Sequence, residues 1–158
     1  MTQTRQIVVT VNGEERNEVV PSRLLLSDFL RGSLGLKGTH VGCEHGVCGC
    51  CTVLMDGQPV RSCLMFAVQV SRHDISTVES LGTQANMHPL QEAFRQEHAL
   101  QCGFCTSGIL MTLVAFLEAN PRPTSHQIRE ALSGNLCRCT GYVNIVRAVE
   151  RYAESTAQ

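Results

Sequence analysis

The stretch that decides the fold is Gly42-Cys43-Glu44-His45-Gly46-Val47-Cys48-Gly49-Cys50-Cys51. It holds four of the chain's nine cysteines, and its three glycines allow the backbone to form a tight loop. Cys43, Cys48 and Cys51 follow the spacing Cys-x4-Cys-x2-Cys. An Asp56-Gly57 turn signal then folds the chain back, so Cys63 should return beside Cys51.

This spacing is typical of the plant-type [2Fe–2S] cluster, with Cys43, Cys48, Cys51 and Cys63 as its four ligands. The glycines would also bring backbone N–H groups close to the anionic sulfurs. Two alternatives are a set of buried reduced thiols and a zinc site. Structural zinc usually shows two Cys-x2-Cys pairs, whereas this group has one.

His45 follows Cys43 closely enough to resemble half of a Rieske centre, in which two histidines replace two cysteines on one iron. The other half would need a second nearby Cys and His pair, and no later cysteine has one. We therefore expect His45 to be a surface loop residue, and the other histidines to be ordinary surface or core residues.

A second cysteine group consists of Cys102 and Cys105, followed by Cys137 and Cys139. Each pair comes directly before a predicted helix, and helix N-termini favour an anionic cluster. Two helix hairpins packed together would bring the four thiolates to one place. Zinc is the alternative, although Cys-x-Cys matches the usual zinc knuckle poorly, and a disulfide is less favoured in a reducing compartment.

Composition excludes several classes of protein. The 158 residues are 43% hydrophobic and 17% charged, with a net charge of -1, which argues against a nucleic-acid-binding surface and against disorder. The longest apolar stretch, residues 109–117, is shorter than the roughly 20 residues of a membrane span. Residues 1–6 show no secretory segment, so we expect a cytoplasmic protein, in which many cysteines indicate metal binding.

The pattern of residues predicts an α+β protein with two domains. Residues 1–80 should form a β-rich domain with one helix. The expected elements are a hairpin of strands at 6–11 and 19–20, a helix at 24–34, a hairpin around Asp56-Gly57 and a strand at 75–78. Residues 81–158 should form a four-helix bundle, with helices at 90–98, 107–119, 124–132 and 144–154. Pro89 and a Thr124–Gln127 capping box mark two of the helix starts.

Three motifs carry a family resemblance. They are Gly42 to Gly49, Gln101-Cys102-Gly103-Phe104-Cys105, and Gly134-Asn135-Leu136-Cys137-Arg138-Cys139-Thr140-Gly141-Tyr142. Together they resemble the small iron–sulfur subunit of the xanthine oxidase and carbon monoxide dehydrogenase family of molybdenum hydroxylases, over roughly residues 5 to 153. The resemblance implies a ferredoxin-like β-grasp domain followed by a four-helix [2Fe–2S]-binding domain.

The resemblance also implies roles. The first cluster would pass electrons to FAD on a medium subunit, and the second, held by Cys102, Cys105, Cys137 and Cys139, would lie nearest a molybdenum–pterin cofactor on a large subunit. Gln101 and Cys139 would contact the pterin. The chain would be one member of a heterotrimer, alone or dimerised, and would itself hold no substrate site, so its sequence does not name the substrate.

Two positions depart from the family pattern. Cys50 stands where a small residue is common, and Ser107 stands where proline is frequent. We expect Cys50 to be a packed thiol rather than a ligand. Two other functions compete with an electron-transfer subunit: a free-standing two-cluster ferredoxin and a zinc-stabilised interaction module. The helical second domain and the weak net charge argue against a free carrier.

Overall fold

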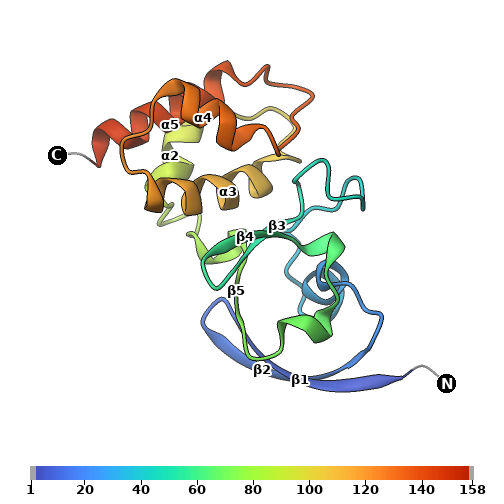
Figure 1. The fold of residues 1–158 in the computed structure, drawn as a ribbon. Helices are drawn as coiled ribbons and strands as arrows, with labels where there is room; N and C mark the ends of the chain where they lie inside the picture. The colour runs from blue at the N-terminus through green and yellow to red at the C-terminus, as the bar shows by residue number, and fades with distance from the viewer. Residues whose placement is uncertain (1–2, 157–158) are drawn as a thin grey trace.

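A computed structural model describes residues 3–156 and shows a mixed five-stranded sheet followed by a helical bundle (Figure 1). The sheet has the strand order β2-β1-β5-β3-β4, in which β1 and β5 are parallel and the other neighbours are antiparallel. The strands are β1 (Thr4–Val11), β2 (Glu14–Pro21), β3 (Thr52–Met55), β4 (Gln58–Arg61) and β5 (Asp74–Ser76). The α+β class and the ferredoxin-like first domain are confirmed.

The first hairpin forms where the Asn12-Gly13 signal predicts it. Both turn residues have positive φ, +52° and +81°, which is the backbone of the type I′ turn that matches strand twist. On β1, Ile7 and Val9 are buried while Val8 between them is exposed, as expected for alternation across a sheet. The second hairpin, β3–β4, closes around Asp56-Gly57 and pairs Thr52 with Arg61.

The helix expected at residues 24–34 is different in the structure. A single α-helical turn, α1 (Leu26–Asp28), passes into a π-helical turn, η1 (Phe29–Ser33), which ends with a hydrogen bond from the Leu34 amide to the Phe29 carbonyl at 3.0 Å. The wider turn keeps the large side chains of this segment in the core, and Gly32 weakens the preference for an α-helix. The strand expected at 75–78 also ends early, because the Thr77 side chain bonds to Asn12 at 2.9 Å.

The second half contains the four expected helices, each within two residues of its predicted bounds. They are α2 (Pro89–Gln96), α3 (Thr106–Ala119), α4 (Ser125–Leu132) and α5 (Val143–Ser155). Pro89 occupies the first turn of α2, and the capping box of α4 joins Thr124 to Gln127. None of the helices described in residues 3–156 is long and apolar enough to cross a membrane.

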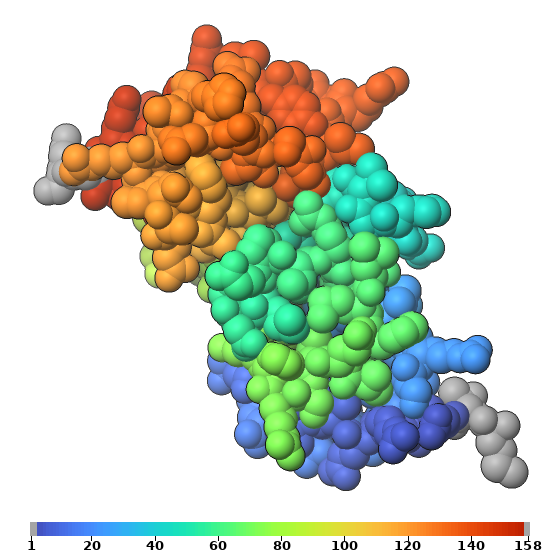
Figure 2. Space-filling model, in the orientation of Figure 1, coloured from blue at the N-terminus to red at the C-terminus, as the bar shows by residue number. Residues whose placement is uncertain are grey.

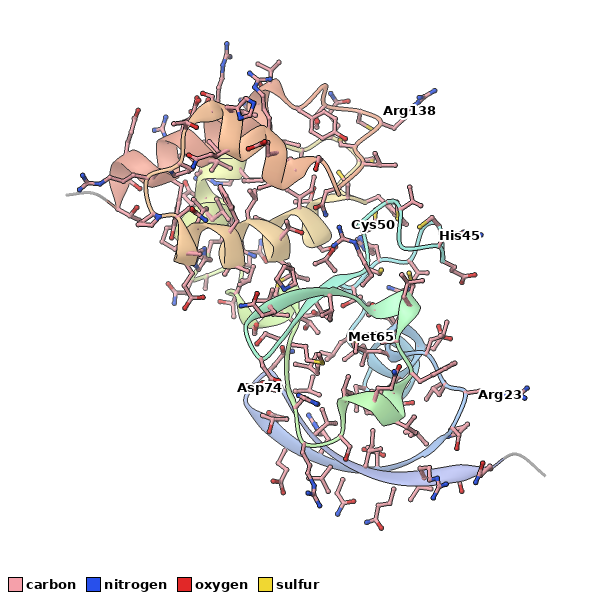
Figure 3. The ribbon with its side chains drawn as sticks, viewed as in Figure 1. Arg23, His45, Cys50, Met65, Asp74 and Arg138 are labelled. Carbon is pink, nitrogen blue, oxygen red and sulfur yellow. The ribbon has the colours of Figure 1, made fainter. Side chains whose placement is uncertain are left out.

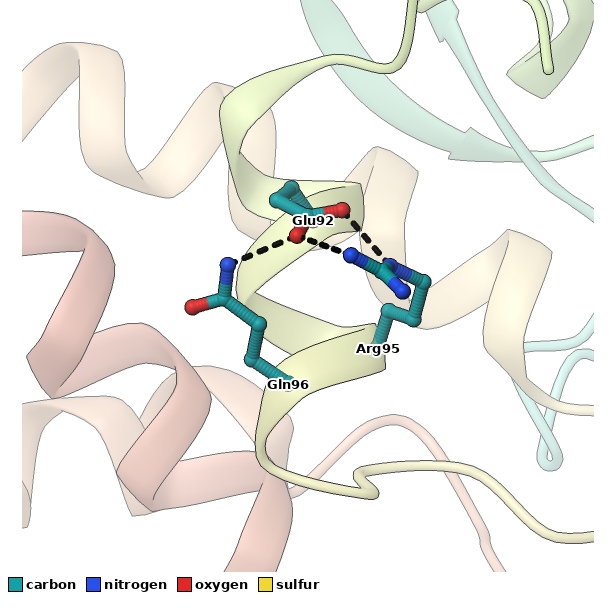
Figure 4. Close-up of polar contacts among 3 residues, drawn as sticks. All are labelled: Glu92, Arg95 and Gln96. Carbon is teal, nitrogen blue, oxygen red and sulfur yellow. Dashed lines mark hydrogen bonds and ion pairs between the residues drawn. The ribbon is translucent and has the colours of Figure 1, made fainter.

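Helix α2 has a polar outer face. On α2, Glu92 accepts hydrogen bonds from Arg95 and Gln96, which lie three and four residues further along the same face of the helix (Figure 4). The Arg95 guanidinium, and then the Gln96 amide, hold the pKa of Glu92 at about 2. The opposite face of α2 buries Leu90 and Phe94 in the bundle.

The two halves of the chain each have a hydrophobic core, and they lie at opposite ends of an elongated molecule (Figure 2). The β core contains eleven buried residues, from Ile7 on β1 to Ile75 on β5. The helical core contains residues of all four helices together with Cys50, which belongs to residues 42–51, the first cysteine loop. The first cysteine loop therefore takes part in the packing of the second half.

Candidate metal centres

The first cysteine loop directs backbone amides at a sulfur. The N–H groups of His45 and Cys48 each donate to Cys43 Sγ at 3.4 Å. These hydrogen bonds, that of Cys48 first, lower the pKa of the Cys43 thiol to about 6. The site therefore favours the thiolate form, which is the form that binds a metal.

Cys51 and Cys63 are brought together by the β3–β4 hairpin. Cys51 comes directly before β3, and Cys63 lies in the short 3-10 turn after β4; the Ser62 amide and hydroxyl both donate to the Cys51 carbonyl, at 3.3 and 2.7 Å. Both thiols are buried, and burial, followed by a hydrogen bond with Cys51, raises the pKa of Cys63 to about 11. Buried thiolates need a cation beside them, so this pair suits a metal site.

The cysteines of the second group also form pairs, and they lie in the two loops that precede α3 and α5. Cys102 Sγ and Cys139 Sγ lie 3.6 Å apart. Cys105, the residue before α3, bonds through its thiol to Cys137, and burial raises the pKa of Cys105 to about 12. Burial opposes ionisation of Cys137, but the hydrogen bonds from Thr140, followed by those with Cys139 and Cys105, together outweigh it and lower the pKa of that thiol.

The eight thiols thus form four pairs: Cys43 with Cys48, Cys51 with Cys63, Cys102 with Cys139, and Cys105 with Cys137. Within residues 3–156, no three His, Cys, Asp or Glu side chains converge on one point where a single ion would bind. A [2Fe–2S] cluster takes two thiolates on each of its two irons, so two pairs on one loop system fit one cluster. None of the nine cysteines, all of which lie within the described residues, forms a disulfide.

A seam of hydrogen bonds joins the two cysteine groups. The Leu136 amide donates to the Cys48 carbonyl at 2.9 Å, and Asn135 Nδ2 donates to the Gly49 carbonyl at 3.2 Å. Arg61 Nη2 donates to the Gly134 carbonyl at 2.7 Å. The loops that carry the two groups therefore lie side by side (Figure 1). Sequence reasoning missed Arg61 and Asn135, because cysteine spacing carries no signal for partners so distant along the chain.

Cys50 lies at this seam, where its thiol also forms a hydrogen bond with Cys48. Its side chain is 4% exposed and packs in the helical core, at the junction of the two halves (Figure 3). Burial, followed by a hydrogen bond with Cys48, raises the pKa of the Cys50 thiol to about 12. A neutral packed thiol is the state expected for a small hydrophobic residue.

The exposed edge of the site carries the remaining predicted residues. His45 is exposed and projects from the loop in Figure 3, which confirms the expectation of a surface residue; its ring bonds to the Cys43 carbonyl. Gln101 is exposed, and its Nε2 donates to the Cys139 carbonyl at 3.0 Å. Large apolar side chains are exposed in the segments that carry both groups: Val47, Leu64 and Phe66 in the first, and Leu100, Leu136 and Val143 in the second. Phe104 is also exposed, and its ring lies against Gly42 of the first loop.

Gly108 permits the close approach of α3 to the first loop. A Cβ at this position would lie 2.1 Å from the Gly49 carbonyl oxygen and 2.9 Å from Cys50 Cα. Both are backbone atoms, so relief of the clash would require the loop and the helix to separate. The glycine is therefore required for the packing that brings the two cysteine groups together.

We expect Gly108→Ala to lower the free energy of unfolding by about 2 kcal/mol or more, because the overpacking exceeds the roughly 1 kcal/mol that alanine gains in a helix. The measurement is the thermal midpoint of the purified protein. Gly32→Ala is the matched control, since a Cβ there meets nothing within 4 Å. Equal midpoints for the two variants would contradict the close approach.

Comparison with known proteins extends this account. A family model described as "2Fe-2S iron-sulfur cluster binding domain" matches residues 9–75, and one described as "[2Fe-2S] binding domain" matches residues 77–150. The chain is 54% identical over 153 residues to the caffeine dehydrogenase subunit gamma of Pseudomonas sp. (strain CBB1), covering 95% of this chain and 92% of that protein. It is 58% identical over 144 residues to the nicotine 6-hydroxylase small subunit of Paenarthrobacter nicotinovorans, covering 91% and 87%.

Solved structures have the same fold. The quinoline 2-oxidoreductase of Pseudomonas putida 86 matches with a TM-score of 0.94 at 49% identity, over 99% of this chain and 98% of the matched chain. The aldehyde oxidoreductase of Desulfovibrio gigas matches with a TM-score of 0.92 at 42% identity, over 97% of this chain but 17% of that one. With two cluster-binding domains in order and relatives of this identity over nearly its whole length, the chain belongs to the family of small iron–sulfur, electron-transfer subunits of molybdenum hydroxylases.

Proposed function

We propose that the four thiol pairs hold the two [2Fe–2S] clusters of this electron-transfer subunit. Cys43 and Cys48 would bind one iron of the first cluster, and Cys51 and Cys63 the other. In the second cluster the two pairs are Cys102 with Cys139 and Cys105 with Cys137. The observation that carries the proposal is the pairing itself, because two pairs of thiols per site match two irons with two thiolates each.

One-electron transfer is the chemistry that the clusters supply when they are bound. The chain's own residues fix where that transfer takes place. The bond from the Leu136 amide to the Cys48 carbonyl connects the residue before one proposed ligand to a proposed ligand of the other cluster. Buried Cys50 and the Asn135 bond to Gly49 exclude water from the same junction. This arrangement supports direct relay between the two clusters.

Gln101 and Cys139 are proposed to contact the pterin of the molybdenum cofactor. Gln101 uses one side-chain N–H on the Cys139 carbonyl, and its amide has a second N–H and a carbonyl oxygen for a ligand. Cys102 and Cys139 are exposed, whereas Cys105 is buried and Cys137 half-buried. The Cys102–Cys139 side of the second cluster would therefore face the cofactor.

The chain is a subunit of a multi-subunit complex. For its composition we propose a heterotrimer with a large molybdenum-cofactor subunit and a medium FAD subunit. The exposed apolar residues near the second cysteine group would dock on the former, and those near the first group on the latter. We also propose a location in the cytoplasm, because a chain with this many cysteines that bind metal is typical of a compartment in which thiols are kept reduced.

The proposed substrate of the assembled enzyme is an N-heterocyclic compound. The support comes from the names of similar proteins, which act on caffeine, nicotine and quinoline. The complex purified from its native host should lose visible cluster absorption when such a compound is added without an electron acceptor. Retention of absorption with every N-heterocycle, together with bleaching by an aldehyde, would contradict the substrate class.

Replacement of Gln101 by Ala tests the pterin contact. We expect both clusters to remain, because Gln101 is no ligand, but substrate-dependent reduction of the clusters should slow by roughly tenfold, as is usual for loss of a hydrogen bond that orients a cofactor. The measurement is stopped-flow bleaching of the assembled enzyme. Gln84→Ala, at an exposed glutamine of the linker, is the control. Equal rates in the two variants would rule out the contact.

A further inference from the structure

Thr140 places two hydrogen-bond donors on one sulfur. Its hydroxyl oxygen lies 3.0 Å from Cys137 Sγ, and its backbone N–H donates to the same sulfur at 3.5 Å. Thr140 is half-buried in the loop that leads into α5, directly after the Cys137-Arg138-Cys139 turn. These two hydrogen bonds therefore change the electrostatic environment of the sulfur in addition to holding the loop in place.

The hydroxyl proton of Thr140 has a defined direction. The Tyr142 N–H donates to Thr140 Oγ1 at 3.2 Å, so that oxygen already serves as an acceptor. A hydroxyl has one proton to donate, and Cys137 Sγ is the acceptor within reach. The geometry depends on left-handed backbone at Gly141, with φ of +65°, which turns the Tyr142 amide back toward Thr140.

The Tyr142 side chain holds the rest of the loop. Its hydroxyl accepts from the Cys137 amide at 2.7 Å and donates to the Asn135 carbonyl at 3.0 Å. The Cys137 N–H is therefore occupied by Tyr142 and is not directed at a sulfur. In the first site the donors to Cys43 are the backbone amides of His45 and Cys48, which no side-chain substitution removes.

We propose that Thr140 sets the reduction potential of the second [2Fe–2S] cluster, by donating its O–H to the Cys137 sulfur. The inference rests on the proposed role of Cys137 as a ligand. When the cluster accepts one electron from the molybdenum site, it gains one negative charge, and no bond to a protein atom forms or breaks. A hydrogen bond to the ligand sulfur stabilises this additional charge, so it raises the potential and makes the cluster easier to reduce.

The test is a reductive titration of the assembled holoenzyme, followed by electron paramagnetic resonance of both clusters. Thr140→Val keeps the shape of the side chain and removes the hydroxyl. Its second-cluster potential should shift to a lower value, while the first-cluster potential stays unchanged and serves as an internal reference. Thr140→Ser, which restores a hydroxyl, should return the potential toward that of the native protein. Thr140→Ala provides a second hydroxyl-free variant, with the same expected shift, should the valine variant assemble poorly.

Tyr142→Phe separates the hydrogen bond from loop mobility, because it removes the Tyr142 hydroxyl contacts and leaves the backbone donor to Thr140 in place. Its potential should shift less than that of Thr140→Val. The inference is overturned if hydroxyl-free variants with full iron content keep both native potentials, or if Tyr142→Phe and Thr140→Val shift the potential equally. Either of these results would overturn the role of Thr140 but not the assignment of the cluster ligands. If the native protein instead contained no iron, the proposed function itself would be overturned.

Discussion

Cys51→Ala should remove one of the two clusters, whereas Cys50→Ala should leave both in place. Cys51 pairs with Cys63 at the end of the β3–β4 hairpin. Cys50 is packed in the helical core, where burial raises the pKa of its thiol to about 12. Iron content should therefore fall from about four to about two per chain in the Cys51 variant, since each plant-type cluster holds two irons. Cys50→Ala should keep the native iron content and visible spectrum.

The neighbouring position makes Cys50→Ala a matched control for the loss of a thiol from the same loop. The reverse outcome, a lost cluster in the Cys50 variant and two intact clusters in the Cys51 variant, would show that the loop is shifted by one residue. It would also imply that the Cys51–Cys63 pair of the structure is not a ligand pair.

Chain prepared without iron should lose cooperative unfolding in both halves. Each proposed cluster joins segments that are far apart in sequence, from Cys43 to Cys63 and from Cys102 to Cys139. Without iron, buried thiols such as Cys105 stay protonated and no longer join these segments through a metal, so metal-binding free energy is lost from folding. The seam should loosen as well, because its bonds join the same loops.

Calorimetry and circular dichroism of iron-free and iron-loaded protein measure this effect. The loaded protein should show a sharp transition, and the iron-free protein a broad transition at lower temperature, with the helical signal lost as readily as the β signal. If the iron-free protein melts as sharply as the loaded one, the clusters do not organise the two cores, and the β core around Ile7 and Phe29 and the helical core around Ile109 suffice.

Much of the fold follows from local signals in the sequence. The Asn12-Gly13 turn, the Asp56-Gly57 hairpin, Pro89 and the Thr124 capping box act over a few residues, and the structure contains each of them as predicted. The π-turn at Phe29–Ser33 was missed because it depends on packing. Leucine periodicity is the same for an α-helix and for a segment in which tertiary burial widens one turn.

The sequence predicts the cysteines of the site but not the residues that hold the two cysteine groups together, because the latter also depend on tertiary packing. Cysteine spacing identifies the thiols, because ligand chemistry requires particular residues at particular separations. The residues that join the two groups, such as Arg61 and Asn135, act through bonds to backbone carbonyls, which many residue types can form. The Thr140 contact with Cys137 lies in a loop that ends with left-handed backbone at Gly141 and Tyr142, a conformation that tyrosine rarely adopts and that sequence pattern does not reveal.

The content of iron and acid-labile sulfide in the purified chain tests the central claim most directly. Eight paired thiols should hold two [2Fe–2S] clusters, so the account predicts about four irons and about four sulfides per chain. Stoichiometric zinc without sulfide, or half of this iron content in fully loaded native protein, would contradict it.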